Sequence, residues 1–177
     1  GADLLTKSIT CFEQLNPFFA DCLRKMDELK HFDLESRKGK APGGYNCPLT
    51  ESGAPFIFMN AASSTRDVET MVHEGGHAIH SFEVRELPIN AFRNPTMEVA
   101  ELASMSMELL SMDHWDVFFA NPDELRRAKL QHLRAGGNGG LGRRCAAGRR
   151  HHVRLGVGER QAASRFQRTL TAASPQR

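Results

Sequence analysis

The sequence predicts a mainly α-helical domain that carries one small β element near residues 32–61. Apolar residues recur at helical spacing over residues 3–30 and again over residues 64–82. Between these segments, short apolar runs are bounded by Gly and Pro turn residues, a pattern that favours strands. The 177 residues are 40% hydrophobic and 25% charged, which suits one compact core and excludes disorder along the whole chain. No apolar run approaches the roughly 18 residues that a bilayer needs, so we expect no membrane span.

Residues 3–30 are expected to form two helices that divide at Asn16-Pro17. Asparagine is a favourable helix cap and proline a favourable first-turn residue, so this pair restarts the helix. Each helix has an apolar face that we expect to lie in the core. The faces are formed by Leu4, Leu5, Ile9, Phe12 and Leu15, and then by Phe19, Cys22, Leu23, Met26 and Leu29.

The β element is expected to contain two or three strands. Phe32-Asp33-Leu34-Glu35 alternates apolar and polar residues, and Phe56-Ile57-Phe58-Met59 is a short apolar run. Turns are predicted at Pro42-Gly43-Gly44 and at Ser52-Gly53-Ala54-Pro55.

Three further helices follow the β element. The first begins near Ser64, where Asp67 completes a capping box. The next opens at Asn94-Pro95 and ends near Met112, and the last runs from Asn121-Pro122 to about Leu133. The first of them has a buried stripe formed by Val68, Met71, Val72, Ile79 and Phe82.

An HExxH motif, His73-Glu74-Gly75-Gly76-His77, lies inside the helix that begins near Ser64. Residues four apart share one helix face, so both imidazoles can reach one tetrahedral metal ion. Glu74 points about 100° away from His73, where it can take a proton from a metal-activated water. Each glycine costs about 1 kcal/mol against alanine in a helix interior. We therefore expect another backbone, or a substrate, to approach the helix closely at Gly75 and Gly76.

A third metal ligand is expected from the following helix, because a catalytic zinc ion usually has three protein ligands. The candidates are Glu98, Glu101 and Glu108, in a segment otherwise composed mostly of Ala, Leu, Ser, Val and Met. Spacing alone leaves Glu98 and Glu101 open as alternatives.

Four segments together resemble the oligoendopeptidase F branch of the thimet oligopeptidase family of zinc metallopeptidases. The resemblance covers about residues 1–134 and is strongest over residues 38–112. The pattern HExGHxxH, followed at this distance by E-x-x-S, is characteristic of the family. The segments are Lys40-Ala41-Pro42-Gly43-Gly44-Tyr45, Pro55-Phe56-Ile57-Phe58-Met59-Asn60, His73-Glu74-Gly75-Gly76-His77-Ala78-Ile79-His80 and Glu98-Val99-Ala100-Glu101-Leu102-Ala103-Ser104.

The resemblance implies a zincin-like helical catalytic core with one Zn²⁺ per chain. By this resemblance His73 and His77 bind the zinc ion, and Glu74 is the general base and proton shuttle. Glu101 would be the third ligand, which makes Glu98 the less favoured candidate.

Two further residues receive supporting roles from the resemblance. His80 matches the last histidine of HExGHxxH, and we expect it to support the site or the fold rather than bind the metal. Glu108 matches a family glutamate that orients a zinc-binding histidine.

The implied function is that of a zinc metalloendopeptidase, an oligopeptidase that hydrolyses short peptides. In the implied mechanism, zinc-bound water attacks the scissile carbonyl, while Glu74 removes the proton and passes it to the leaving amine. Family members are several times longer than this chain. The alternative is therefore a truncated, catalytically inactive zinc-binding fragment of such an enzyme.

The charge distribution divides the chain near residue 134. Residues 1–134 have a net charge of −6, and we expect them to form a partial zinc-metallopeptidase catalytic domain. Residues 135–177 hold nine Arg, no Lys and one acidic residue, a net charge of +8. We expect this Arg/Gly-rich tail to be disordered or irregular and not native to the fold.

A frame-shifted end is the favoured explanation of the tail, because the sequence becomes rich in arginine, glycine and alanine at the point where the family pattern stops. A genuine disordered basic tail and a nucleic-acid-binding extension are the alternatives. The charge would attract phosphate, but only Phe166 could stack a base, so nucleic-acid binding is disfavoured.

The cysteines and the N-terminus favour a cytoplasmic location. Cys11, Cys22, Cys47 and Cys145 show no CxxC spacing, so we expect reduced thiols. The first residues lack a basic segment followed by an apolar one, so no signal peptide is expected.

Overall fold

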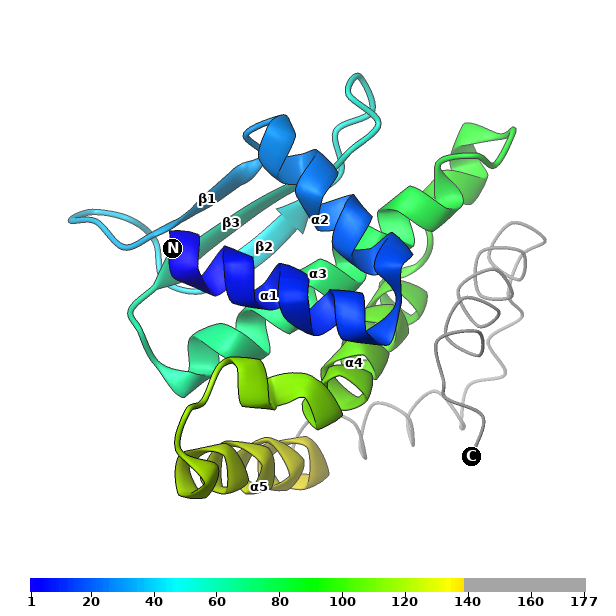
Figure 1. Ribbon diagram of the computed structural model, residues 1–177. Helices are drawn as coiled ribbons and strands as arrows, with labels where there is room; N and C mark the ends of the chain where they lie inside the picture. Colours follow the sequence, from blue (N-terminus) through cyan, green and yellow to red (C-terminus); the bar gives the residue numbers. More distant parts are fainter. Residues whose placement is uncertain (139–177) are drawn as a thin grey trace.

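The computed structural model describes residues 1–138 of the chain, with the backbone alone for residues 135–138. It confirms a mainly helical fold with one small sheet (Figure 1). The α-helices are α1 (Ala2–Leu15), α2 (Pro17–Glu28), α3 (Thr65–Val84), α4 (Met97–Ser111) and α5 (Pro122–Asn138). The strands are β1 (Phe32–Glu35), β2 (Gly44–Cys47) and β3 (Phe56–Ala61), and the 3₁₀ helices are η1 (Asn90–Arg93) and η2 (Met112–Val117).

The sheet has three strands in the order β1-β3-β2, within the predicted range of residues 32–61. Strand β3 lies in the middle, parallel to β1 and antiparallel to β2. Alternate residues of β3 enter the core, where Ile57 and Met59 are almost completely buried. Strands β2 and β3 contact α3, so the sheet supports the helix that contains the HExxH motif.

Helices α1 and α2 form a hairpin that packs on α3 and confirms the predicted division at Asn16-Pro17 (Figure 1). The Asn16 side chain accepts a hydrogen bond of 2.9 Å from the backbone N–H of Phe18, which caps α2. Phe12 of α1 and Phe19 of α2 are completely buried. The hairpin therefore supplies one wall of the core.

Helix α3 runs through the centre of the core. Its capping box forms as predicted, since the Asp67 carboxylate accepts a 2.7 Å hydrogen bond from the backbone N–H of Ser64. All five residues of its predicted stripe are buried: Val68, Met71, Val72, Ile79 and Phe82.

The boundaries of two helices differ from the prediction. Helix α4 begins at Met97, with Thr96 as its N-cap, rather than at Asn94-Pro95. Asn94 instead caps η1, and its side chain donates a 3.1 Å hydrogen bond to the carbonyl oxygen of Asn90, the first residue of η1. Helix α5 continues to Asn138, past the expected end near Leu133, because glycine lowers helix propensity without forbidding the helix. The rest of the Arg/Gly-rich segment and Cys145 lie outside the described residues. The division at residue 134 therefore stays a prediction.

Candidate metal centre

Three side chains from two helices converge beside the HExxH motif. His73 and His77 project from α3 and Glu101 from α4, and one ligand atom from each lies within 4.8 Å of the others. His73 Nε2 is 3.6 Å from Glu101 Oε2, and His77 Nε2 is 4.0 Å from Glu101 Oε1. Ligand atoms of one zinc ion are each about 2.0–2.2 Å from it, so two of them lie at most about 4.4 Å apart. Both histidine–glutamate distances are within this limit. The 4.8 Å span of the whole group is slightly larger, so small side-chain shifts would bring all three ligand atoms onto a single metal ion.

Two glycines allow the helices to meet at this point. A Cβ on Gly76 would lie 2.7 Å from the Ser104 Cα atom of α4, and a Cβ on Gly75 would lie 2.6 Å from the Phe12 ring of α1. Both distances are shorter than real Cβ contacts. The predicted close approach of another backbone is confirmed at Gly76, while Gly75 accommodates an aromatic ring.

Glu74 lies next to the cluster and is only 6% exposed. Burial is the main cause that raises the pKa of its carboxyl to about 7, with His73 opposing the rise and Glu101 adding to it. The Asn46 side chain of β2 donates a 3.5 Å hydrogen bond to the Glu74 backbone carbonyl and so links this turn of α3 to the sheet. A carboxyl group with such a pKa can both accept and donate a proton near neutral pH.

Each of the two imidazoles also makes a hydrogen bond to a neighbouring group of α4. His73 Nδ1 donates a 2.5 Å hydrogen bond to Glu108 Oε1, and the His77 ring hydrogen-bonds to the backbone of Ala100. Burial works to lower the pKa of His73, but Glu108, with smaller contributions from Glu74 and Glu101, opposes it and the net shift is upward. Burial, followed by the charge of His73, lowers the pKa of His77 to about 4. Metal-binding histidines in proteins typically show a hydrogen bond of this kind on the second ring nitrogen.

The other sequence candidates lie outside the three-residue group. Glu98 is exposed in the first turn of α4. His80 is 3% exposed, and burial, followed by the charge of His77, lowers its pKa to about 4. Glu108 contacts His73 from the side that faces away from Glu101.

Two residues that adjoin the site, Glu69 and His132, were not predicted from the sequence. His132 Nε2 is 3.1 Å from Glu108 Oε2, and His132 Nδ1 is 3.7 Å from Glu69 Oε1. Glu69 stands four residues before His73, so helical spacing alone could have placed it on the same face. His132 lies on α5, and no local pattern connects it with the motif.

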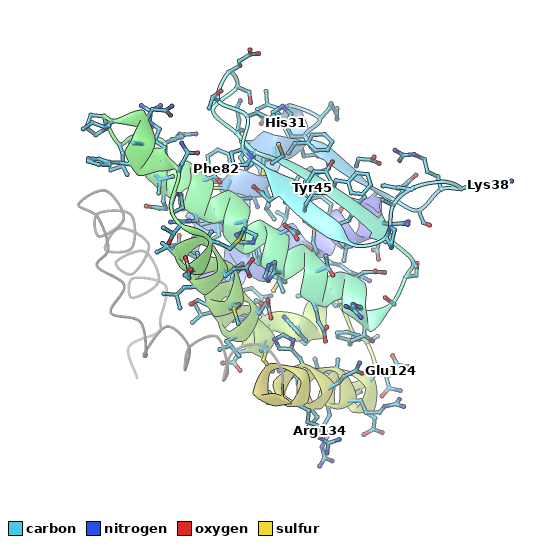
Figure 2. All side chains as sticks on the ribbon, turned by 180° about the vertical axis from the view of Figure 1, so that it is seen from behind. His31, Lys38, Tyr45, Phe82, Glu124 and Arg134 are labelled. Atoms are coloured by element: carbon cyan, nitrogen blue, oxygen red, sulfur yellow. The ribbon has the colours of Figure 1, made fainter. Side chains whose placement is uncertain are left out.

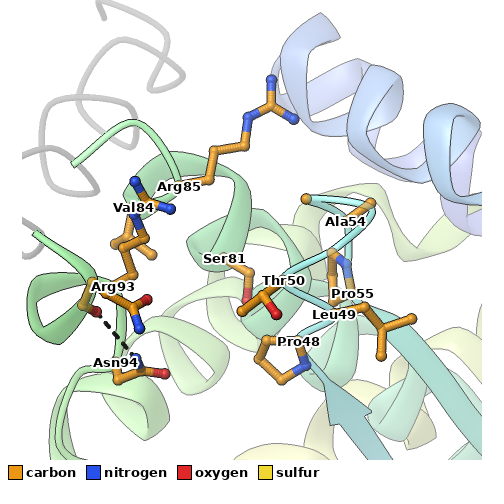
Figure 3. Close-up of a pocket in the computed structure, with 12 residues that line it drawn as sticks. Pro48, Leu49, Thr50, Ala54, Pro55, Ser81, Val84, Arg85, Arg93 and Asn94 are labelled. Atoms are coloured by element: carbon orange, nitrogen blue, oxygen red, sulfur yellow. Dashed lines mark hydrogen bonds between the residues drawn. The ribbon is translucent and has the colours of Figure 1, made fainter. Parts of the chain in front are cut away.

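A separate surface pocket of about 80 Å³ lies near the C-terminal end of α3 (Figure 3). Pro48, Thr50 and Ser81 line one side of it, and Arg93 and Asn94 line another. None of His73, His77 and Glu101 lines this pocket. Among residues 1–138, no helix combines the length and the apolar character that a bilayer crossing requires.

The chain is similar to known peptidases over most of the described residues. The family model for Peptidase family M3 matches residues 19–136. Oligopeptidase PepF of Bacillus subtilis (strain 168) is 34% identical over 96 residues, which are 52% of this chain and 14% of that protein. The plasmid-borne oligoendopeptidase F of Lactococcus lactis subsp. cremoris is 33% identical over 81 residues, which are 46% of this chain and 13% of that protein.

A solved structure shows the same arrangement of elements. The structure of PZ peptidase A with an inhibitor superimposes with a TM-score of 0.75 at 27% sequence identity. The match covers 98% of this chain and 32% of that one. The chain thus spans about a third of this solved structure and a smaller share of the two bacterial relatives.

Proposed function

Because this chain belongs to peptidase family M3, we propose that it forms the zinc-binding core of a metalloendopeptidase that hydrolyses short peptides. The observation that carries the proposal is the convergence of His73, His77 and Glu101 within 4.8 Å. Two imidazoles and one carboxylate are a ligand set that catalytic zinc sites of peptidases use. His73 and His77 would hold the ion through Nε2, and Glu101 through its carboxylate.

Zinc held by these residues would supply Lewis acidity, which lowers the pKa of water and polarises a carbonyl group. Glu74 would accept the proton of the attacking water and donate it to the leaving amine. Its burial next to the cluster and its pKa of about 7 support this role. Glu108 would fix the tautomer of His73 by accepting the Nδ1 proton.

Short peptides are the proposed substrates because the matched relatives are named oligopeptidase and oligoendopeptidase. The proposed cytoplasmic location is supported by the cysteine pattern, which lacks CxxC spacing. The disfavoured nucleic-acid binding stays a prediction about residues outside the described range.

A second candidate function is that of a catalytically inactive, zinc-binding fragment. Its support is the small share of the relatives that the chain matches, 14% of the Bacillus subtilis protein. In this case the cluster would still bind zinc, but the chain would not hydrolyse peptides.

Zinc content tests the binding half of the proposal. The purified 177-residue chain should contain one zinc ion per chain by elemental analysis. His73→Ala and Glu101→Ala should abolish stoichiometric zinc, while the exposed Glu98→Ala should retain it as the matched control. A wild-type chain that holds no metal under zinc-replete conditions would contradict the proposal.

Hydrolysis of a fluorogenic peptide separates the two candidates. If the chain is an active peptidase, Glu74→Gln should retain zinc but lose hydrolysis by at least about 100-fold, since general-base catalysis contributes typically 10²–10⁴-fold. A zinc-loaded wild type without activity would favour the inactive fragment.

A further inference from the structure

Behind the candidate metal ligands, a row of charged side chains crosses three helices. His73 on α3 contacts Glu108 on α4, Glu108 contacts His132 on α5, and His132 faces Glu69, back on α3. The three pairs are separated by 2.5, 3.1 and 3.7 Å. The row is mostly buried, with side-chain exposures between 10% for His132 and 23% for His73. Helix α5 thus reaches the site through one histidine.

Glu108 is bound at both carboxylate oxygens. Oε1 accepts from His73 Nδ1, and Oε2 lies against His132 Nε2. A carboxylate held at both ends cannot rotate without losing a contact. The orientation of Glu108, and with it the hydrogen bond that directs His73 Nε2 toward Glu101, therefore depends on His132.

His132 is itself well fixed. Its ring packs against Trp115 of η2, with ring centroids 5.4 Å apart at an angle of 54°. Trp115 Nε1 donates a 3.0 Å hydrogen bond to Ser111 Oγ, and Ser111 Oγ donates one of 3.2 Å to the Glu108 carbonyl oxygen. Ala128, one turn before His132, is buried to 1% exposure. The contacts join η2 and α5 to the end of α4 and leave the imidazole little freedom.

The charges in this row alternate. Hydrogen bonding to Glu108, with Glu69 nearby, raises the pKa of His132 to about 9, so an imidazolium stands between two carboxylates at neutral pH. The Glu69 Oε1 atom is buried and makes no hydrogen bond to the described residues, so the His132 charge is what offsets its burial. An apolar residue at position 132, without a hydrogen-bond donor, would leave two carboxylates facing each other in a partly buried space.

We propose that His132, paired with Glu69, is a positioning residue for the metal: it orients Glu108 so that His73 presents Nε2 to the zinc ion. The inference rests on the proposed function, because it requires that His73 binds zinc. It extends the site from the HExxH helix and α4 to α5, which no motif connects with metal binding. Glu69 serves to hold the His132 ring in its charged form.

Zinc affinity tests the proposal independently of catalysis. The dissociation constant should be measured in the full 177-residue chain by competition with a chromophoric chelator. His132→Leu keeps bulk but removes both N–H donors, so we expect zinc to bind about 10- to 100-fold more weakly. His132→Gln keeps one donor toward Glu108 and should recover most of that loss. Gln131→Leu, at the exposed neighbouring position on α5, should bind zinc like wild type.

A second readout separates positioning from simple packing. The cobalt-loaded chain should show an altered visible absorption spectrum in His132→Leu and a spectrum close to wild type in His132→Gln. Thermal unfolding of the metal-free proteins supplies the folding control. If His132→Leu does not fold, Glu69→Gln takes its place and should weaken zinc binding several-fold.

The results that would contradict the role of His132 differ from those that would contradict the proposed function. A folded His132→Leu that binds zinc within twofold of wild type would overturn the role of His132, as would equal weakening by Leu and Gln. For the replacement variant, unchanged affinity in Glu69→Gln would overturn it. A wild-type chain that binds no zinc would instead contradict the proposed function itself.

Discussion

Lys40 buries its ammonium group at the edge of the sheet. Its side chain is 1% exposed, and Nζ donates to the Asp33 carbonyl and carboxylate and to the Glu35 carbonyl at 2.7–3.0 Å. The same group lies 4.6 Å from the centroid of the Phe58 ring, on which Tyr45 stacks at 5.0 Å. One residue therefore ties the loop after β1 to the strands that support α3.

We predict that Lys40→Met lowers the free energy of unfolding by about 2 kcal/mol, because it removes hydrogen bonds from a charged donor. Lys38→Met is the matched control, since Lys38 is exposed and points away from the protein in Figure 2. The control should change stability by no more than about 0.5 kcal/mol. Urea unfolding of both variants provides the measurement, and equal effects would contradict the assigned role of Lys40.

The same contact predicts how the effect varies with pH. Hydrogen bonds from Arg37, and then from Lys40, hold the pKa of the Asp33 carboxyl well below its usual range. Because the folded-state pKa lies below the unfolded value of about 3.9, the contact stabilises the fold above pH 4 and loses this contribution as the pH falls toward the folded value. The difference between wild type and Lys40→Met should therefore be full at pH 7 and smaller at pH 3. An undiminished difference at pH 3 would argue against the ion pair.

At the scale of elements, the crossing of α3 and α4 determines whether Glu101 reaches the two histidines. The contact point is Gly76, which lies against the backbone of Ser104 and leaves no room for a Cβ atom. At Gly75 the obstacle is the end of the Phe12 ring, a side chain that can shift. The same alanine substitution can therefore be compared at two adjacent positions: at Gly76 the added Cβ atom would clash with backbone, and at Gly75 with a side chain.

Gly76→Ala should separate α4 from α3 and weaken zinc binding by at least about tenfold, because the Cβ atom meets backbone that cannot yield alone. Gly75→Ala should mainly cost stability, about 1–3 kcal/mol for overpacking, reduced by the gain in helix propensity of up to 1 kcal/mol. Zinc affinity and urea unfolding, measured on both variants, distinguish the two effects. If Gly75→Ala weakened zinc binding more than Gly76→Ala, the crossing would not be what positions Glu101.

The helices were more predictable than the sheet because their signals are local. Capping residues such as Asn16 and Asp67, and the apolar periodicity of α3, act within a few positions of the chain. In strand β2, Gly44–Cys47, the apolar residues Tyr45 and Cys47 are exposed, so its place at the edge of the sheet depends on pairing with β3. The preceding strand β1, at the opposite edge of the sheet, pairs with β3 in parallel, and the tertiary packing determines this direction.

At the scale of the whole molecule, the predictable part of the site ends where the chain must fold back on itself. Four-residue spacing is enough to place His73 and His77 on one face of α3. The choice of Glu101 over Glu98 as the third ligand depends instead on how α4 packs against α3, which spacing does not determine. His132 reaches the site only because α5 packs on η2 through Ala128 and Trp115, far along the chain from the motif. Figure 2 shows α5, marked by Glu124 and Arg134, lying beside the other helices.

Zinc should accordingly stabilise the whole chain, because its proposed ligands lie on two helices. An ion bound only by the folded state adds about 2.7 kcal/mol at a free concentration 100 times the dissociation constant. For a chain of this size, this corresponds to a rise in Tm of roughly 5–10 °C. The rise should vanish on addition of a chelator and should be absent in His77→Ala, where one imidazole is missing.

The paired variant Glu98→Ala makes the thermal measurement specific. Both Glu98 and Glu101 lie on α4, but only Glu101 faces the histidines. If zinc acts by joining α3 to α4, Glu98→Ala should keep the rise in Tm and Glu101→Ala should lose most of it. An equal rise in both variants would mean that zinc stabilises the chain through other residues. Calorimetry of the same proteins, with and without zinc, therefore decides whether this cluster links the two helices through one ion.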